Sequence, residues 1–145
     1  MTQNNKLSFE LQSVFTQLRK SALLKHNHSK LKGAEKHMLL LISDLKSGKP
    51  VTTSEIANKI NVTLAAVTHQ INALEKEGLI KRLTDKQDRR IIFIELSKKG
   101  ITHVAQLKKD FAKKIRVLGE FLGEKDTRSL IRIIKKIADF PGFTE

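Results

Sequence analysis

The stretch TSEIANKINVTLAAVTHQINALEKEGLIKRLTDKQDRRIIFIELS, residues 53–97, decides the fold of this chain. Its first half predicts two short helices joined by a tight turn. Thr52 followed by Glu55 is a capping box, because each side chain satisfies a backbone N–H that the helix start leaves free. Asn61 tolerates the left-handed conformation that the turn needs. Thr63 is suited to cap the second helix.

The second half of the stretch predicts a β-hairpin. The second helix ends at Gly78, since Gly is common just beyond a helix. Residues 79–83 and 90–96 are β-branched and aliphatic runs, and the charged segment 84–89 lies between them. Two helices followed by such a hairpin have the order of a winged helix-turn-helix, whose second helix enters the major groove of DNA.

Helices are also predicted on both sides of this stretch. Apolar spacing predicts one over residues 6–26, one over 34–45, and a long one after Ser97 that Gly123 interrupts. A last helix is expected over 126–140, with Leu130, Ile134 and Ile137 facing inward. One apolar stripe of the long helix consists of Val104, Leu107, Phe111, Ile115, Leu118 and Leu122.

The terminal helices carry more apolar surface than a small winged domain covers. Such surfaces usually mark an interface, so a homodimer built from the chain ends is expected. The alternative is a monomer whose terminal helices pack on each other. The expected fold class is mainly α with a small β-hairpin wing. A winged helix-turn-helix DNA-binding domain is assigned to residues 33–97, between helical dimerisation arms at 1–32 and 98–145.

Composition points to a polyanionic partner. The chain has 145 residues and a net charge of +13, which favours nucleic acid first and an anionic membrane surface second. The absence of Trp and Tyr leaves little for stacking on unpaired bases. Because there are no cysteines, disulfides and thiolate zinc sites are excluded. No apolar run approaches the ~20 residues of a membrane span and no signal peptide is evident, so a cytoplasmic protein without a membrane partner is expected.

The second helix of the pair is the candidate reading helix. At about 100° per residue, Leu64, Val67, Ile71 and Leu74 fall on one face and are expected in the core. The other face is small and polar, which allows close approach to base edges: Ala and Thr methyls can touch a thymine methyl, and Asn or Gln can pair with adenine. The alternative is a solvated face that reads nothing. The DNA-contacting candidates on this helix are Thr63, Ala65, Thr68, His69, Gln70 and Asn72.

The hairpin is strongly cationic. Arg90 follows Asp88 by two residues, so that carboxylate could hold it in a bidentate pair. An arginine positioned at a hairpin tip suits the minor groove, where negative potential is concentrated. The alternative is a solvated surface salt bridge. Phosphate contacts are expected from Lys81, Arg82, Lys86 and Arg89.

These residues resemble the MarR family of bacterial transcription regulators. Asp88 to Ser97 fits the family's wing pattern D-x-R-x5-L-[ST], and the paired helices are similar as well. The resemblance implies that Thr68 lies in the recognition helix and that Asp88 orients Arg90 in the minor groove. His69 stands where the family often has Arg or Lys. It also implies a homodimer on pseudo-palindromic double-stranded DNA, and repression relieved by an effector.

Other chemistry is not indicated. The five histidines lack the His-x3-His or His-Glu-x-x-His spacing of a metal site, and no catalytic constellation is present, so no metal, no cofactor and no enzyme activity are expected. Two alternatives to a dimeric repressor stay open. One is a winged-helix accessory protein with little sequence preference, and the other is a module whose basic hairpin binds an acidic protein.

Overall fold

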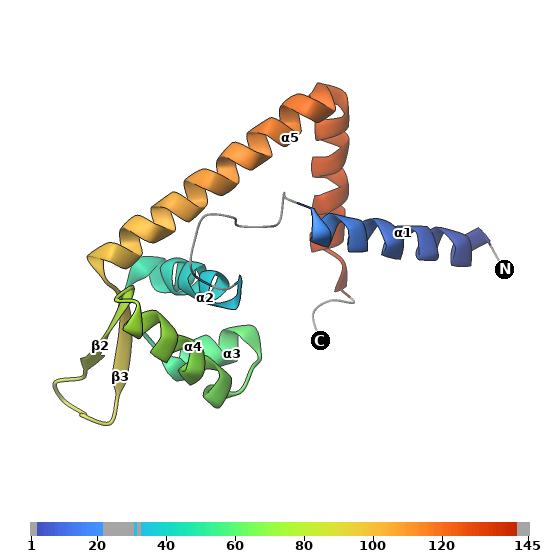
Figure 1. Cartoon of the computed structure of the whole chain (residues 1–145). Coiled ribbons are helices and arrows are strands. Elements are labelled where there is room, and N and C mark those ends of the chain that lie inside the picture. The colour runs from blue at the N-terminus through green and yellow to red at the C-terminus, as the bar shows by residue number, and fades with distance from the viewer. Residues whose placement is uncertain (1–2, 22–30, 32, 142–145) are drawn as a thin grey trace. The chain divides into compact units, whose positions relative to one another are not determined.

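The computed structural model describes residues 3–21, 31 and 33–141 (Figure 1). The order of its elements is α1 (Gln3–Lys20), α2 (Gly33–Asp44), the 3-10 turn η1 (Leu45–Gly48), β1 (Val51–Thr52), α3 (Thr53–Ile60), α4 (Leu64–Lys76), β2 (Ile80–Thr84), β3 (Ile92–Leu96) and α5 (Lys98–Ala138). The predicted mainly helical winged helix-turn-helix is confirmed. The chain forms two compact units, residues 1–108 and 109–145, which are described separately.

The wing is a three-stranded antiparallel sheet in the order β1-β3-β2. The sequence predicts only the β2–β3 hairpin; β1, with two residues, is too short to carry an alternating pattern. Ile94 in the central strand pairs with Val51 on one side and Arg82 on the other. Directly paired residues lie on the same face of a sheet. Since Val51 and Ile94 are fully buried, this face is the inner one.

The core lies between this inner face and the helices α2, α3 and α4. Side chains of all these elements share one buried cluster, which is completed by the start of α5. Its largest fully buried members are Met38, Leu39, Ile42, Ile56, Ile71, Leu74, Ile94, Val51 and Val67. Burial of one such side chain contributes about 1.5–3 kcal/mol, so the helices are fixed by packing rather than by helix propensity.

The predicted helix ends are confirmed. The Thr52 Oγ1 accepts from the Glu55 N–H at 3.2 Å, and the Thr52 N–H donates to Glu55 Oε2 at 2.8 Å, which completes the capping box. Asn61 has φ 50° and ψ 49°, and Gly78 has φ 70°. These left-handed residues set the paths into and out of α4.

The start of α5 is fixed to the segment that links α4 to β2. The Ser97 N–H donates to the Leu79 carbonyl at 3.0 Å, and the Ser97 hydroxyl donates to the Gly78 carbonyl at 2.7 Å. The same hydroxyl oxygen accepts from the Gly100 N–H at 3.0 Å. At Gly100 the two backbones approach so closely that an added Cβ would lie 1.9 Å from the Leu79 oxygen. This joint therefore requires glycine.

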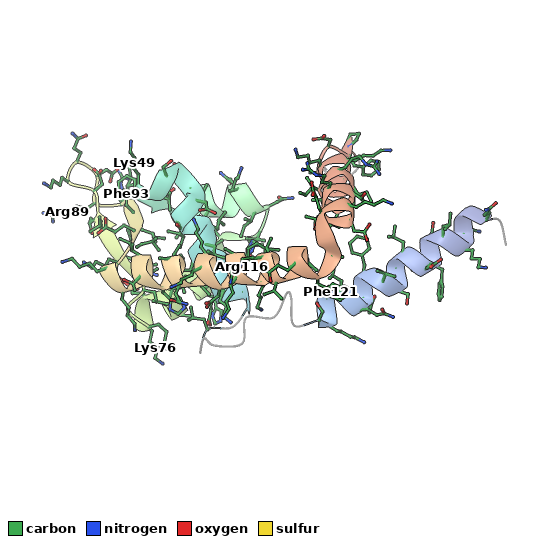
Figure 2. All side chains as sticks on the ribbon, turned by 90° about the horizontal axis from the view of Figure 1, so that it is seen from above. Lys49, Lys76, Arg89, Phe93, Arg116 and Phe121 are labelled. Carbon is green, nitrogen blue, oxygen red and sulfur yellow. The ribbon has the colours of Figure 1, made fainter. Side chains whose placement is uncertain are left out.

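The second unit is the distal part of α5. Gly123, at φ 72° and ψ 172°, interrupts the helix as predicted. The prediction that Ile134 and Ile137 face inward is wrong for the single chain, where they are 55% and 43% exposed. Phe121 is 84% exposed beside the interruption (Figure 2). In the described residues, none of the helices has a stretch long and apolar enough to span a membrane.

Candidate nucleic-acid interface

Helix α4 is seated on the core by one face. Val67, Ile71 and Leu74 are 0% exposed, as the sequence predicts. The N-cap is Thr63, whose Oγ1 accepts from the Ala66 N–H at 3.3 Å. Leu64 departs from prediction, since its side chain is 51% exposed. It is the first residue of α4 and lies at the margin of the apolar stripe, so the core ends before reaching it.

The opposite face of α4 is open. Ala65, Thr68, His69 and Asn72 are exposed, whereas Gln70 is half-buried on the flank. The Thr68 hydroxyl donates to the Leu64 carbonyl of its own helix at 2.8 Å. In this geometry Thr68 presents a methyl group and acceptor lone pairs outward, because its one hydroxyl proton is already used.

The structure brings together two residues to which the sequence assigns separate roles. The Arg82 Nη2 of β2 donates to the Asn72 Oδ1 of α4 at 2.5 Å. The Arg82 Nη1 lies 3.3 Å from Glu75 Oε2, one helical turn further along α4. Arg82 therefore links the wing to the candidate reading helix. Glu75 is absent from the predicted site, because only the spatial pairing reveals its role.

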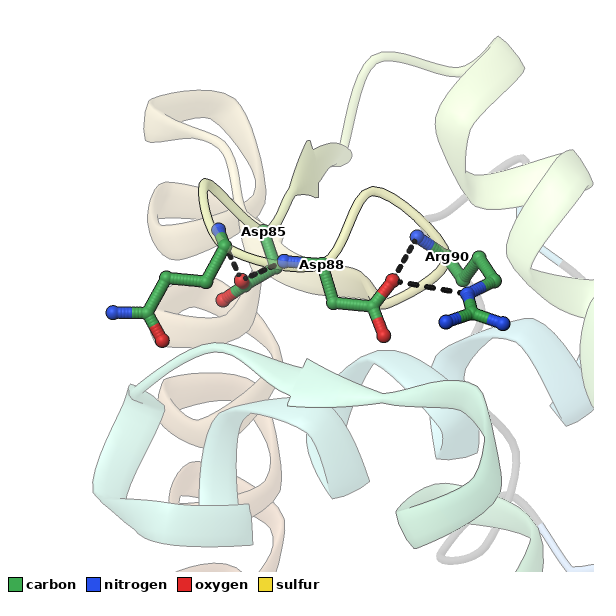
Figure 3. Close-up of polar contacts among 4 residues, drawn as sticks. Asp85, Asp88 and Arg90 are labelled. Carbon is green, nitrogen blue, oxygen red and sulfur yellow. Dashed lines mark hydrogen bonds and ion pairs between the residues drawn. The ribbon is translucent and has the colours of Figure 1, made fainter.

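The tip of the wing is built around Asp85. One carboxylate oxygen of Asp85 accepts the backbone N–H groups of Gln87 at 2.7 Å and Asp88 at 2.8 Å (Figure 3). The hydrogen bond from Asp88, followed by that from Gln87, lowers the pKa of Asp85 below its ordinary value of 3.8. Asp85 is absent from the predicted site, although an Asp that begins a charged loop is a known turn signal.

The predicted contact between Asp88 and Arg90 is present, but it is not a bidentate fork. A single oxygen, Asp88 Oδ1, accepts from the backbone N–H of Arg90 at 2.9 Å and from its Nε at 3.2 Å (Figure 3). The Arg90 side chain remains 93% exposed. An exposed pair of this kind contributes less than about 1 kcal/mol to stability. The pair instead fixes the direction of the Arg90 side chain, because Nε is bound to Asp88 while the rest of the guanidinium faces solvent.

The remaining wing cations have no such anchor. Lys81, Lys86 and Arg89 are exposed, and within the described part of the chain none of them forms an ion pair. Figure 2 shows Arg89 in the loop at the tip of the wing. Cations with this freedom suit phosphate contacts, which need charge rather than fixed geometry.

Metal-ligating side chains do not gather in the residues that the structure describes. Over those residues, no three His, Cys, Asp or Glu side chains are placed to share a metal ion. His26 and His28 lie outside the described residues.

Comparisons with known proteins point to one family. The model of the MarR family matches residues 37–92. The transcriptional regulator AdcR of Streptococcus pneumoniae is 39% identical over 67 residues, which are 46% of this chain and 43% of the relative. The transcriptional repressor MdtR of Bacillus subtilis is 29% identical over 94 residues, 65% of this chain and 59% of the relative. The matches thus span about half the length of these relatives.

A solved structure extends the likeness to the whole chain. Streptococcus pneumoniae FabT, crystallised in complex with DNA, superposes with a TM-score of 0.75 over 98% of this chain and 99% of its own, at 22% identity. At this identity the likeness establishes the fold, including the helices outside residues 37–92. The MarR family consists of transcription regulators and not enzymes. Residues 37–92, which include the paired helices and the start of the wing, thus match the MarR family of winged helix-turn-helix transcription regulators, and the whole chain shares the fold of FabT.

Proposed function

We propose that this protein is a homodimeric, sequence-specific transcriptional repressor that binds pseudo-palindromic double-stranded DNA in the cytoplasm. In this proposal residues 33–97 form the DNA-binding domain, and residues 1–32 and 98–145 form the dimerisation arms. The observation that carries the proposal is the combination of an open, small polar face on α4 with a wing whose exposed Arg90 is oriented by Asp88.

The chemistry of the two surfaces supports a division of roles. The α4 face offers methyl groups, a histidine and an amide, which are suited to base edges in the major groove. The oriented guanidinium of Arg90 is suited to the narrow minor groove, and the unanchored wing cations to phosphates. A net charge of +13 adds the attraction that any duplex exerts on a basic protein.

Exposed apolar side chains support the homodimer. Within α1 they occur throughout the helix: Leu7, Phe9, Leu11, Val14, Phe15 and Leu18 are each at least 40% exposed. Within the second unit, Phe111, Ile115, Phe121, Ile134 and Ile137 are exposed to a similar degree or more. Apolar surfaces of this kind are rarely left open in a monomer. Two-fold pairing with a second copy would cover both sets.

Relief by a small-molecule effector completes the proposal, and the match to the MarR family alone supports it. A compound that couples to DNA binding should change the affinity by about 5- to 150-fold at saturation. Fluorescence anisotropy of a labelled operator, titrated with protein in the presence of each member of a compound library, measures this change. If no compound changes the affinity more than twofold, this part of the proposal loses its support.

The decisive experiment is selection of bound fragments from a random duplex library at physiological salt with the full chain. A sequence-reading dimer should enrich an inverted repeat with half-sites about one helical turn apart. Recovery of bound fragments that share no sequence motif would instead favour an accessory protein that binds only the DNA backbone. Absence of duplex binding would favour a module that binds an acidic protein.

The dimer is tested separately by sedimentation equilibrium. The full chain should behave as two copies, and Ile134→Asp should shift it toward the monomer, because the charge would be buried in the interface. Lys135→Asp is the matched control: it introduces the same carboxylate on the adjacent, exposed position. A monomeric wild-type chain at micromolar concentration would contradict the proposal.

A further inference from the structure

The contact between Arg82 and Asn72 constrains which base edge α4 can read. Arg82 pairs with Ile94 across the sheet, so its side chain leaves the strand on the inner face, toward the helices. Its neighbour Lys81 lies on the opposite face. Arg82 reaches Asn72 through Nη2 and Glu75 through Nη1. Asn72 and Glu75 are three residues apart and are therefore neighbours on the helix surface, where one guanidinium can contact both.

The chemistry of the guanidinium decides the orientation of the Asn72 amide. Arginine carries only donors, so the group that faces it must be the amide oxygen and not the NH2. A charged donor makes this hydrogen bond stronger than one between neutral groups. The amide NH2 of Asn72 is then left to face outward from α4.

A free asparagine reads adenine through both ends of its amide. The oxygen accepts from adenine N6 while the NH2 donates to adenine N7. In this protein the oxygen is already engaged by Arg82, and only the donor is presented. A lone NH2 donor still reaches adenine N7, but it gains no second hydrogen bond there, whereas guanine exposes two adjacent acceptors, O6 and N7, in the major groove.

We propose that Arg82 is a positioning residue that holds the Asn72 amide with its NH2 outward, so that α4 loses the paired hydrogen bonds to adenine and favours guanine at this position. The inference rests on the proposed function, in which α4 reads duplex DNA. It replaces the prediction that Arg82 is a phosphate contact. Glu75 supports the arrangement, since its carboxylate keeps the guanidinium beside α4 and offsets its charge.

The test compares base preference between wild type and Arg82→Leu in the same library selection, with the full chain. Arg82→Leu removes the donors but keeps an aliphatic stem on the inner face. The wild type should enrich guanine at one position of each half-site. Arg82→Leu should shift that position toward adenine by several-fold, leave the rest of the motif unchanged, and keep the salt dependence of binding. In an Asn72→Ala background, Arg82→Leu should change no preference.

Lys81→Leu is the matched control, because it removes a cation from the adjacent residue on the other face of the same strand. It should weaken all sequences alike and lower the slope of log K against log salt by about one unit if Lys81 contacts a phosphate. If Arg82→Leu behaves in that way and leaves the motif unchanged, Arg82 is a phosphate contact and the proposal is overturned.

A readout without DNA tests the positioning itself. In NMR spectra, the Asn72 side-chain NH2 group should have restricted mobility and shifts displaced from those of a free asparagine amide in wild type, and both features should be lost in Arg82→Leu. Unchanged Asn72 resonances in the variant would overturn the positioning role.

Failure of the wild type to enrich any motif refutes the proposed function, and the base preference with it, whatever the NMR result. The two failures are therefore distinguishable. A thermal melt of each variant checks that it is folded.

Discussion

The replacement Gly100→Ala should destabilise the protein more than the addition of one methyl group suggests. Its Cβ would lie 1.9 Å from the Leu79 carbonyl oxygen and 3.0 Å from the Leu79 carbonyl carbon. Real Cβ contacts do not fall below 3.0 Å, so the first turn of α5 and the Leu79 backbone would have to separate by about 1.1 Å, the difference between 3.0 and 1.9. Both partners are backbone, so no side chain can rotate to make room.

The magnitude follows from three terms, two of which destabilise the folded protein and one of which stabilises it. Overpacking a tight site costs about 1–3 kcal/mol, and a forced backbone shift belongs at the upper end of that range. Ala gains about 1 kcal/mol over Gly from helix propensity. The separation also strains the hydrogen bonds from Ser97 to Gly78 and Leu79, each worth about 1 kcal/mol. We expect a net loss of about 2–3 kcal/mol in the free energy of unfolding.

Urea denaturation followed by circular dichroism measures this loss. Gly119→Ala is the control in the same helix, since its Cβ would meet only the Thr127 Oγ1 at 4.0 Å. That variant should be unchanged, or more stable by up to about 1 kcal/mol from propensity. If Gly100→Ala were as stable as Gly119→Ala, the joint between α5 and Leu79 would be looser than described, and the reasoning would be refuted.

Three further predictions concern the wing and the cap of α3. Arg90→Ala should weaken operator binding at least tenfold in a gel-shift assay without changing the melting temperature; near-normal affinity would remove the wing from the proposed interface. Thr52→Ala should lower the free energy of unfolding by about 1 kcal/mol in urea denaturation, because it removes the capping box with Glu55; an unchanged value would mean that water replaces the cap at no cost. The lowered pKa of Asp85 means that its contribution to the wing loop is present above pH 3.8 and is lost as pH falls through its folded-state pKa. The backbone amide of Asp88 should shift in NMR spectra over that acid range, whereas Asp85→Asn should abolish the shift.

Local signals in the sequence predict the helix-turn-helix well. The capping box at Thr52, the left-handed turn at Asn61 and the glycine after α4 each depend on residues a few positions apart, and each was predicted correctly. The interruption of α5 at Gly123 belongs to the same class. These features are set by backbone conformation, which the local sequence largely determines.

Features that depend on distant pairing were missed. Strand β1 exists only because Val51 meets Ile94, and two residues carry no strand pattern of their own. The exposure of Leu64 depends on where the core ends, which helical periodicity does not specify. The link from Arg82 to Asn72 joins two elements whose relative position the sequence alone does not give. The identities of the candidate DNA contacts remain predictions.

The cations of the wing fall into two groups, those paired with a carboxylate and those without such a pair. We expect the first group to affect sequence specificity and the second to affect overall affinity for DNA. Arg82 and Arg90 are each held by a carboxylate, Glu75 and Asp88 respectively. A held guanidinium has a fixed direction, and its partner offsets part of its charge. The other wing cations are exposed and form no ion pair within the described residues; they are Lys81, Lys86 and Arg89.

Each unanchored cation that contacts a phosphate should add about 0.9 to the salt slope of binding. Replacing one of them should therefore change the slope and leave the enriched motif intact. Replacing Glu75 or Asp88 by the uncharged amide should have the opposite signature: the motif should broaden while the slope is kept or increases, because a cation is released rather than removed. Measuring slope and motif for both groups of variants separates orientation from charge at each cation of the wing, which affinity alone cannot do.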